Sequence, residues 1–354
     1  MTTALIIGLG DMGERIAAGL ATGGRVERLV LASRSLHNVE DAAAAIAAAS
    51  GSLVEPAQVD ATRLEDVAHL IDRVHPHLIV QCASLRNPSA LAGRTDAAAR
   101  GVVAAGFALR LPYQLPVVLN VMRAAEQAGF TGPVANLSLP DVTGPVLKAV
   151  GHAPRLGLGN AGMMMLRARA ALRVQAPQAE VPLVRVLAHH HQLDGVMEAR
   201  PPASPQDRCR VFLGEDGTRD DDLAYRPPGL EPHGRGNFVT AAAAIPVLEA
   251  LLPEGGTLRW SVPAPDGLPG GYPVRIEAGE VALDLPPDQP LDEAIAFNER
   301  IAKGDGVERI DPDGTVHFTD AARSAVATFA PDLAEPLKVA DLDARAELLD
   351  EVLG

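Results

Sequence analysis

A glycine pattern directly after the first apolar run is the feature that most constrains this chain. Residues 8–13 have the spacing G-x-G-x-x-G, between an apolar run at residues 4–7 and a helical apolar pattern at residues 12–20. In a βα turn the first glycine makes the tight bend, the second lets the backbone approach a pyrophosphate, and the third lets helix pack on strand. A tight turn without a ligand is the alternative. We expect a dinucleotide site at the positive end of the helix, made by Gly8, Leu9, Gly10, Asp11, Met12 and Gly13.

Apolar runs and helical patterns alternate through the first 150 residues. The runs lie at residues 4–7, 29–32, 78–82 and 134–139, and the helical patterns at residues 12–20, 41–49, 64–74 and 116–128. This alternation predicts parallel βαβ units. We expect Pro116 in the first turn of its helix and Gly129 at the end of that helix.

The pattern changes after residue 150. A helix is expected from residues 157–162 through Ala170 and a strand at residues 182–189, before a polar, proline-rich stretch at residues 200–236. That stretch is either an active-site lid or a weakly ordered insertion. A helix at residues 237–252, bent at Pro246, and strands at residues 258–262, 274–278 and 281–285 follow.

The predicted fold class is α/β. We expect a Rossmann-type domain with a doubly wound parallel sheet over residues 1–150 and a mixed α+β substrate domain over residues 151–335. Residues 336–354 are expected to form a C-terminal helix that packs on the rest of the chain.

Composition excludes several classes of protein. A formal net charge of −14 argues against a nucleic-acid binder, which needs clustered basic residues. The two cysteines, Cys82 and Cys209, provide neither a disulfide framework nor a CxxC metal site, as in a reducing cytoplasm. The sequence contains no apolar run of membrane-spanning length. We expect a cytoplasmic homodimer whose other partner is a small-molecule substrate, with no membrane and no nucleic acid.

The end of the second apolar run distinguishes between the two nicotinamide dinucleotides. An acidic side chain there would bind the ribose 2′-hydroxyl of NAD and repel a 2′-phosphate. This chain has Ser33, Arg34 and Ser35 instead. A guanidinium between two hydroxyls suits a phosphate dianion, because charge-assisted hydrogen bonds are about twice as strong as neutral ones. We predict NADP(H) as the cofactor, with a solvated loop arginine as the alternative for Arg34.

About the first 90 residues resemble the nucleotide domain of saccharopine dehydrogenase-like oxidoreductases. The matching segments are residues 8–13, 32–34, 59–61 and 78–82. The resemblance implies that Asp60 and Ala61 border the adenine, and that Cys82, Ala83 and Ser84 border the nicotinamide ribose. The later sequence departs from saccharopine dehydrogenase itself.

A second resemblance is to lactate and malate dehydrogenases. In that family a strand ending in a turn precedes the substrate domain, and a later strand carries the catalytic histidine. Residues 136–143 and 184–191 fall in the same order, so the resemblance implies that His190 takes the place of that histidine. The family's aspartate partner on the preceding helix has no match, because Leu166 is followed by Arg167.

Three consecutive histidines are the best candidates for proton transfer. Nicotinamide chemistry needs a proton donor or polariser at the developing alkoxide or amine, and histidine titrates near neutral pH. The three histidines are expected at the end of the strand at residues 182–189, where strand alternation sends His190 to the opposite face from His189 and His191. A surface cluster and a metal site through His189 and His191 are the alternatives. No carboxylate or cysteine stands at ligand spacing, so we predict no metal.

Other polar residues follow apolar runs at the edge where ligands collect in open α/β sheets. Asp141 and Tyr113 are catalytic candidates, the first to orient a histidine or amine and the second to relay a proton. Helix capping, ion pairing, packing and turn formation are the alternatives for these residues. Candidates for substrate binding are Arg86, Asn160 and His191, and Lys148 is a further possible base or a surface residue.

Together these features predict an NADP(H)-dependent oxidoreductase. Its expected reaction is reduction of C=O or C=N in a small polar substrate, or the reverse oxidation. Two alternatives are a synthase or isomerase that returns the hydride to its substrate, and an NADPH-sensing protein without catalysis.

Overall fold

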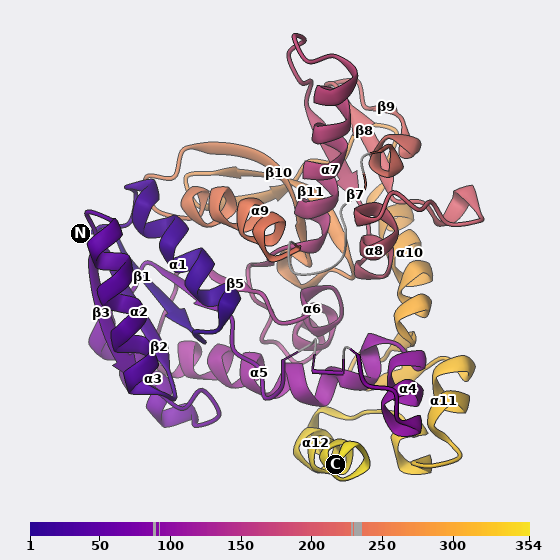
Figure 1. Ribbon diagram of the computed structural model, residues 1–354, viewed down its shortest axis with the longest axis horizontal. Coiled ribbons are helices and arrows are strands. Elements are labelled where there is room, and N and C mark those ends of the chain that lie inside the picture. The colour runs from indigo at the N-terminus through magenta and orange to yellow at the C-terminus, as the bar shows by residue number, and fades with distance from the viewer. Residues whose placement is uncertain (88–89, 92, 228, 230–235) are drawn as a thin grey trace.

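A six-stranded parallel sheet organises the first half of the chain in the computed structural model, which describes residues 1–87, 90–91, 93–227, 229 and 236–354 (Figure 1). The strand order is β3-β2-β1-β4-β5-β6. The strands are β1 (Thr3–Ile7), β2 (Arg28–Ser33), β3 (Leu53–Gln58), β4 (Leu78–Gln81), β5 (Val134–Asn136) and β6 (Leu156–Gly157). In this order β2 and β3 are added on one side of β1 and β4, β5 and β6 on the other, which confirms the predicted doubly wound Rossmann-type fold.

Helices cover both faces of this sheet because its central strands are apolar on both sides. In β1, Ala4 and Ile6 belong to one core, whereas Leu5 and Ile7 belong to another. The helices of this half of the chain are α1 (Asp11–Gly23), α2 (Leu36–Ala49), α3 (Leu64–Val74), α4 (Ala97–Ala104), α5 (Leu111–Gln127) and α6 (Pro140–Ala149). The cores on the two faces take apolar residues from α1 and α2 on one side and from α3 and α5 on the other.

Two predicted element boundaries in this half are wrong. Pro116 lies inside α5 rather than in its first turn, which holds Pro112, because the helix already begins at Leu111. The strand expected through residue 139 ends at Asn136, whose side chain accepts a hydrogen bond from the Ser138 backbone at 2.9 Å. Leu139 then adopts a φ of 48°, and helix α6 begins at the next residue.

Smaller antiparallel sheets form the remainder of the chain. Their strands are β7 (Val184–Leu187), β8 (Arg210–Leu213), β9 (Thr218–Arg219), β10 (Thr257–Pro263), β11 (Gly271–Glu277), β12 (Glu280–Leu283), β13 (Val307–Ile310) and β14 (Val316–Phe318). The accompanying helices are α7 (Asn160–Gln175), α8 (Leu193–Met197), α9 (Gly236–Ala250), α10 (Leu291–Ala302), α11 (Asp320–Val326) and α12 (Leu342–Leu353).

Part of the polar stretch at residues 200–236 forms the strands β8 and β9. Its strand β8 pairs with β7, so this part of the stretch is neither a lid nor a weakly ordered insertion. Residues 228 and 230–235 of the stretch lie outside the described residues. The expected domain boundaries stay predictions. Strand β6, which pairs with β5, extends the Rossmann sheet beyond the expected boundary at residue 150.

Residues far apart in the sequence share one core. Helices α4, α5 and α6 bury apolar side chains together with residues 302–353. Helix α12 lies against α5, below it in Figure 1, and its Leu349 is fully buried. No single helix in the described part of the chain is long and apolar enough to cross a membrane, although Ala97–Ala104 and Phe107–Gln127 pass that test jointly across a 115° bend.

Replacing Leu349 with alanine should measure how strongly α12 is anchored. The change removes a fully buried side chain from the shared core, so we expect the free energy of unfolding to fall by about 2 to 5 kcal/mol in urea denaturation. Glu347→Ala, on the exposed face of the same helix, should change it by about 0.5 kcal/mol or less. Equal effects of the two substitutions would contradict the packing of α12.

Candidate functional site

A cleft of about 660 Å³ opens at the carboxyl ends of the Rossmann strands. Ligands collect at this edge in open α/β sheets. All residues that the sequence assigns to the cofactor line it: Gly8, Leu9, Gly10, Asp11, Met12, Gly13, Ser33, Arg34, Ser35, Asp60, Ala61, Cys82, Ala83 and Ser84. Asn160 and His190 line the same cleft, which places a candidate proton donor beside the glycine turn.

The glycine turn has the shape that a pyrophosphate requires. A Cβ at Gly8 would lie 2.4 Å from the backbone nitrogen of Ala83, and a Cβ at Gly13 would lie 2.2 Å from the Gly8 carbonyl oxygen. Gly8 also has a φ of 101°, where side chains are strained. No described atom lies within 4 Å of a Cβ built at Gly10, so the space before the N-terminus of α1 is open. The residues present therefore fit a bound dinucleotide.

The end of the cleft beside β2 carries a cation. Arg34 is the one arginine or lysine among the described residues of the cleft lining, and its exposed guanidinium has no ion pair in the described chain. The neighbouring Ser35 caps helix α2 by accepting a hydrogen bond from the Asn38 backbone at 3.4 Å. A hydrogen bond from the Thr62 hydroxyl, together with the nearby charge of Arg34, holds the pKa of Asp60 below its usual value.

The three histidines lie in a turn and not on a strand. Strand β7 ends at Leu187, and residues His190–Gln192 form a single 3-10 turn. The turn is closed by two hydrogen bonds, from the His189 backbone to Gln192 Oε1 at 2.9 Å and from the His191 backbone to His189 Nδ1 at 3.3 Å. The predicted alternation of faces is therefore wrong, because the chain leaves the strand before the histidines begin.

All three histidine rings face one buried carboxylate, Asp305. His190 Nδ1 lies 2.8 Å from Asp305 Oδ2, within hydrogen-bond distance. The Nδ1 atoms of His189 and His191 lie 3.5 Å and 3.4 Å from the carboxylate oxygens. Asp305 is 2% exposed, so solvent screens these interactions little.

The pKa values of the two neighbouring histidines His189 and His190 shift in opposite directions. Burial lowers the pKa of His190, but the charge and hydrogen bond of Asp305 outweigh burial and hold this pKa above its usual value. For His189, burial outweighs the charges of Asp305 and Asp141 and lowers the pKa. Burial raises the pKa of Asp305, but the histidine charges and hydrogen bonds outweigh it and hold this pKa below its usual value. His190 is thus the member of the group that suits proton donation near neutral pH.

Two glycines make the approach of Asp305 to the histidines possible. A Cβ on Gly304 would lie 2.3 Å from the His191 ring, and one on Gly306 would lie 2.3 Å from the Ala105 carbonyl oxygen. Gly306 also has a φ of 92°. The sequence analysis missed Asp305, and its one local signal is the run Gly304-Asp305-Gly306.

Asp141 and Asn160 hold the histidine turn in place. Asp141 is buried, and its Oδ1 accepts a hydrogen bond from the His190 backbone at 3.0 Å. Its Oδ2 accepts a hydrogen bond from Asn160 Nδ2 at 2.5 Å. Asn160 and His190 line the cleft, whereas Asp141 does not. Asp141 therefore holds two cleft residues by hydrogen bonds from outside the cleft.

Phe107, which the sequence analysis did not single out, covers the histidine from the side of α4. Its ring packs edge-on against His190, with ring centroids 4.3 Å apart and an interplanar angle of 73°. The guanidinium of Arg110 lies 3.9 Å above the centroid of the Phe107 ring. Phe107 and His190 both line the cleft, so the two rings form one part of its wall.

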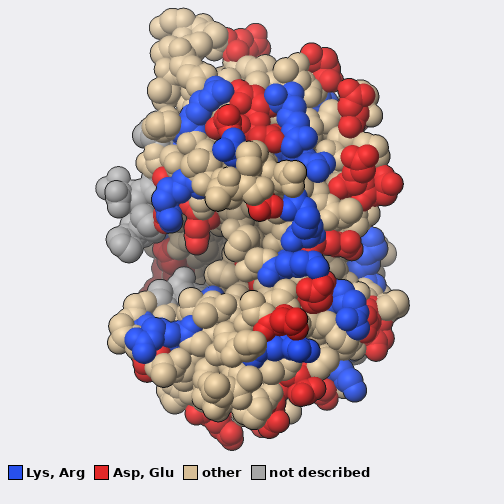
Figure 2. Space-filling model, turned by 90° about the vertical axis from the view of Figure 1, so that its right-hand side faces the viewer, with Lys and Arg blue, Asp and Glu red and all other residues tan. Residues whose placement is uncertain are grey.

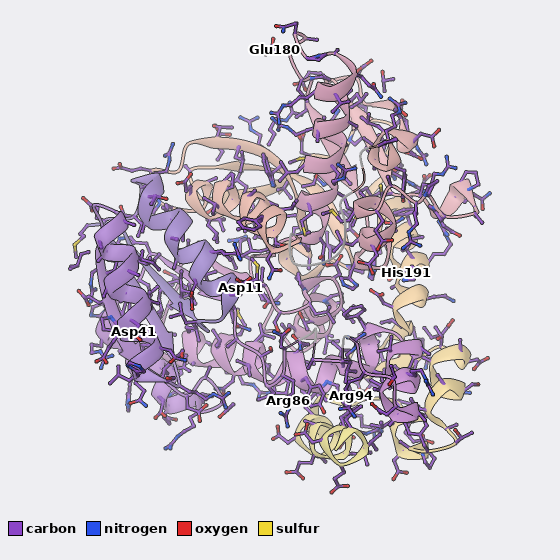
Figure 3. All side chains as sticks on the ribbon, in the orientation of Figure 1. Asp11, Asp41, Arg86, Arg94, Glu180 and His191 are labelled. Atoms are coloured by element: carbon purple, nitrogen blue, oxygen red, sulfur yellow. The ribbon has the colours of Figure 1, made fainter. Side chains whose placement is uncertain are left out.

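The remaining candidates do not line the cleft. The Tyr113 hydroxyl donates to Asp350 of α12 at 2.8 Å, and Arg86 forms an ion pair with the same carboxylate at 3.1 Å. Figure 3 shows Arg86 close to α12 and His191 close to α10, and neither residue lines the cleft. Lys148 lies on the exposed face of α6. Among the described residues, no group of three or more His, Cys, Asp or Glu side chains is arranged to hold a metal ion.

A comparison with known protein families finds a match in the N-terminal part of the chain. The model of the KR domain family matches residues 2–108, which contain the glycine turn and the first four strands of the Rossmann sheet. A search of curated protein sequences found no match. The KR match supports a nucleotide-binding oxidoreductase, while the narrower resemblance to saccharopine dehydrogenase-like proteins stays a prediction.

Comparison with solved structures extends the similarity over most of the chain. A lactate dehydrogenase from a Medee basin deep-sea metagenome library is 15% identical with a TM-score of 0.51, covering 86% of this chain and 97% of its own. Malate dehydrogenase from Salinibacter ruber is 15% identical with a TM-score of 0.51, covering 85% and 94%. Malate dehydrogenase from Plasmodium falciparum is 12% identical with a TM-score of 0.54, covering 95% and 100%. These similarities confirm the predicted resemblance at the level of the fold.

Asp305→Asn should lower the pKa of His190. Without the carboxylate, burial dominates, so we expect this pKa to fall from above about 6.5 to below it. The measurement is NMR titration of the histidine Cε1 protons, with the His190 signal assigned from its loss in His190→Ala. Asp320→Asn, at a highly exposed site, should leave the titration unchanged. An unchanged His190 pKa in the Asp305 variant would show that the pairing does not control protonation.

Proposed function

We propose that this chain is an NADP(H)-dependent oxidoreductase that reduces C=O or C=N in a small polar substrate, or carries out the reverse oxidation. The observation that carries the proposal is the His190–Asp305 pair, whose histidine lines the same cleft as the glycine turn. The KR domain match and the dehydrogenase fold support the same reaction class.

The cofactor would be held along the whole cleft. The open backbone at Gly10 and the N-terminus of α1 suit the pyrophosphate, and the Arg34 guanidinium suits a 2′-phosphate. Asp60 and Ala61 would border the adenine, and Cys82, Ala83 and Ser84 would border the nicotinamide ribose; all five residues line the cleft. When bound, the nicotinamide supplies or accepts the hydride.

The protein's own contribution is control of one proton. In reduction, the imidazolium of His190 donates a proton from Nε2 to the developing alkoxide or amine, while Nδ1 stays hydrogen-bonded to Asp305. In oxidation, the neutral imidazole accepts that proton. Asp305 fixes the ring orientation and stabilises its charged form, and Asp141 fixes the backbone of the same residue. Asp141 and Asp305 are thus positioning residues, and Asn160 is a candidate substrate contact in the cleft.

NADPH should bind at least tenfold more tightly than NADH. One charged hydrogen bond to the 2′-phosphate contributes about 1.5 to 3 kcal/mol, and 1.4 kcal/mol corresponds to about a factor of ten. Arg34→Ala should remove most of this preference, whereas Arg63→Ala, an exposed arginine outside the cleft lining, should keep it. Cofactor fluorescence titrations of the three proteins test this expectation. Equal affinities in the unmodified protein would exclude NADP(H) selectivity.

Loss of the His190 imidazole should slow turnover without weakening cofactor binding. General acid catalysis typically contributes a factor of about 10² to 10⁴, so His190→Ala should lower kcat by about a hundredfold or more. NADPH affinity should stay within about threefold. His191→Ala, whose ring is half exposed and outside the cleft lining, should cost less. The assay follows NADPH oxidation against a panel of small carbonyl compounds, and a fully active His190 variant would remove this residue from the mechanism.

A further inference from the structure

A second cavity, of about 760 Å³, lies behind the residues that hold the histidine turn. It is bounded by α6, α10, strand β13 and the loop before β11. Its wall includes Asp141, which hydrogen-bonds to His190 and Asn160 on the cleft side. This cavity is therefore separate from the dinucleotide cleft but shares a wall with it. Its volume is within the range of small-molecule sites, about 300 to 1,000 Å³.

One buried polar atom among the residues of this cavity has no partner. His189 lines the cavity, is fully buried, and its Nε2 makes no hydrogen bond in the described chain. Its Nδ1 accepts a hydrogen bond from the His191 backbone at 3.3 Å and lies 3.5 Å from Asp305 Oδ2 without a hydrogen bond to it, so the neutral ring carries its proton on Nε2. A buried N–H without an acceptor is destabilising, and an oxygen atom of a ligand would offset this cost.

The other groups around the cavity favour an uncharged ligand. Its walls are largely apolar, with Val142, Pro145 and Ala149 on α6 facing Leu268, Ile295 and Ile310.

The charged side chains at the rim have both signs and largely neutralise one another. Lys303 pairs with Glu308 at 2.6 Å and Arg309 pairs with Asp311 at 3.0 Å. Lys148 and Glu299, which have opposite charges, make no ion pair in the described chain. Figure 2 shows the same mixture of acidic and basic side chains over the face that carries α10. Inside, the buried carboxylate of Asp141 disfavours an anion.

We propose that this cavity is a second binding site, for an uncharged apolar molecule that carries one hydroxyl or carbonyl oxygen. The oxygen accepts the hydrogen bond of His189 Nε2, and the apolar body packs between α6 and α10. A molecule bound there contacts Asp141 from the side opposite His190. The site is thus independent of the dinucleotide, although it touches a residue that positions the proton donor.

Three matched probes test the proposal by calorimetric titration of the full chain, with and without NADPH. p-Cresol has an apolar ring and one hydroxyl, toluene lacks the oxygen, and 4-methylbenzoate is an anion. We expect p-cresol to bind about tenfold more tightly than toluene, because one buried hydrogen bond of about 1.4 kcal/mol corresponds to a factor of ten. 4-Methylbenzoate should bind more weakly than p-cresol, and NADPH should not compete.

Two variants locate the binding. His189→Phe keeps a ring but removes the donor, so p-cresol and toluene should then bind equally. Ala149→Phe fills the cavity from α6 and should weaken both by tenfold or more, while Ala45→Phe on the exposed face of α2 should change neither. The proposal is overturned if p-cresol does not bind, if toluene binds equally well to the unmodified chain, if NADPH competes, or if Ala149→Phe has no effect. Should His189→Phe fail to fold, the toluene comparison and Ala149→Phe decide.

Discussion

Burial of the Asp305 carboxylate is the constraint on which the site depends. Removing an ionised carboxylate from water costs several kcal/mol unless nearby donors and charges offset the loss. At 2% exposure, Asp305 meets this requirement through His190, with the rings of His189 and His191 nearby. The same carboxylate raises the pKa of His190 against the effect of burial, so the interaction that offsets the burial of Asp305 also favours the charged form of His190.

This interaction joins three parts of the chain at one point. The Rossmann strands provide the cleft, the turn after β7 provides the imidazole, and the loop after α10 provides the charge. Asp141, at the start of α6, fixes the turn to the Rossmann half through the His190 backbone. The geometry of the proposed proton donor is therefore set by packing between these segments and not by any one of them.

The sequence predicts the Rossmann half well because its signals are local. The glycine spacing identified the cleft lining, and the helix expected at residues 64–74 is α3 with the same bounds. Strand β3 was not recognised, since it is an edge strand whose apolar run is interrupted by Glu55 and Pro56. Asp305 could not be paired with His190 from sequence, because the contact spans 115 residues and leaves no periodic pattern. Side-chain hydrogen bonds that end a strand early, as at His189, are equally invisible to hydrophobic spacing.

Helices α4, α5 and α6 share a core with residues 302–353, and this shared core has a consequence for folding during translation. Chains are synthesised from the N-terminus, and segments begin to fold as they leave the ribosome. The Rossmann strands can pair early, but the side of α5 that packs against α12 stays uncovered until α12 has been translated. During that interval an apolar surface around α5 is open to chaperones or to other nascent chains. The His190–Asp305 pair also forms only after this stretch has been translated, because Asp305 belongs to it.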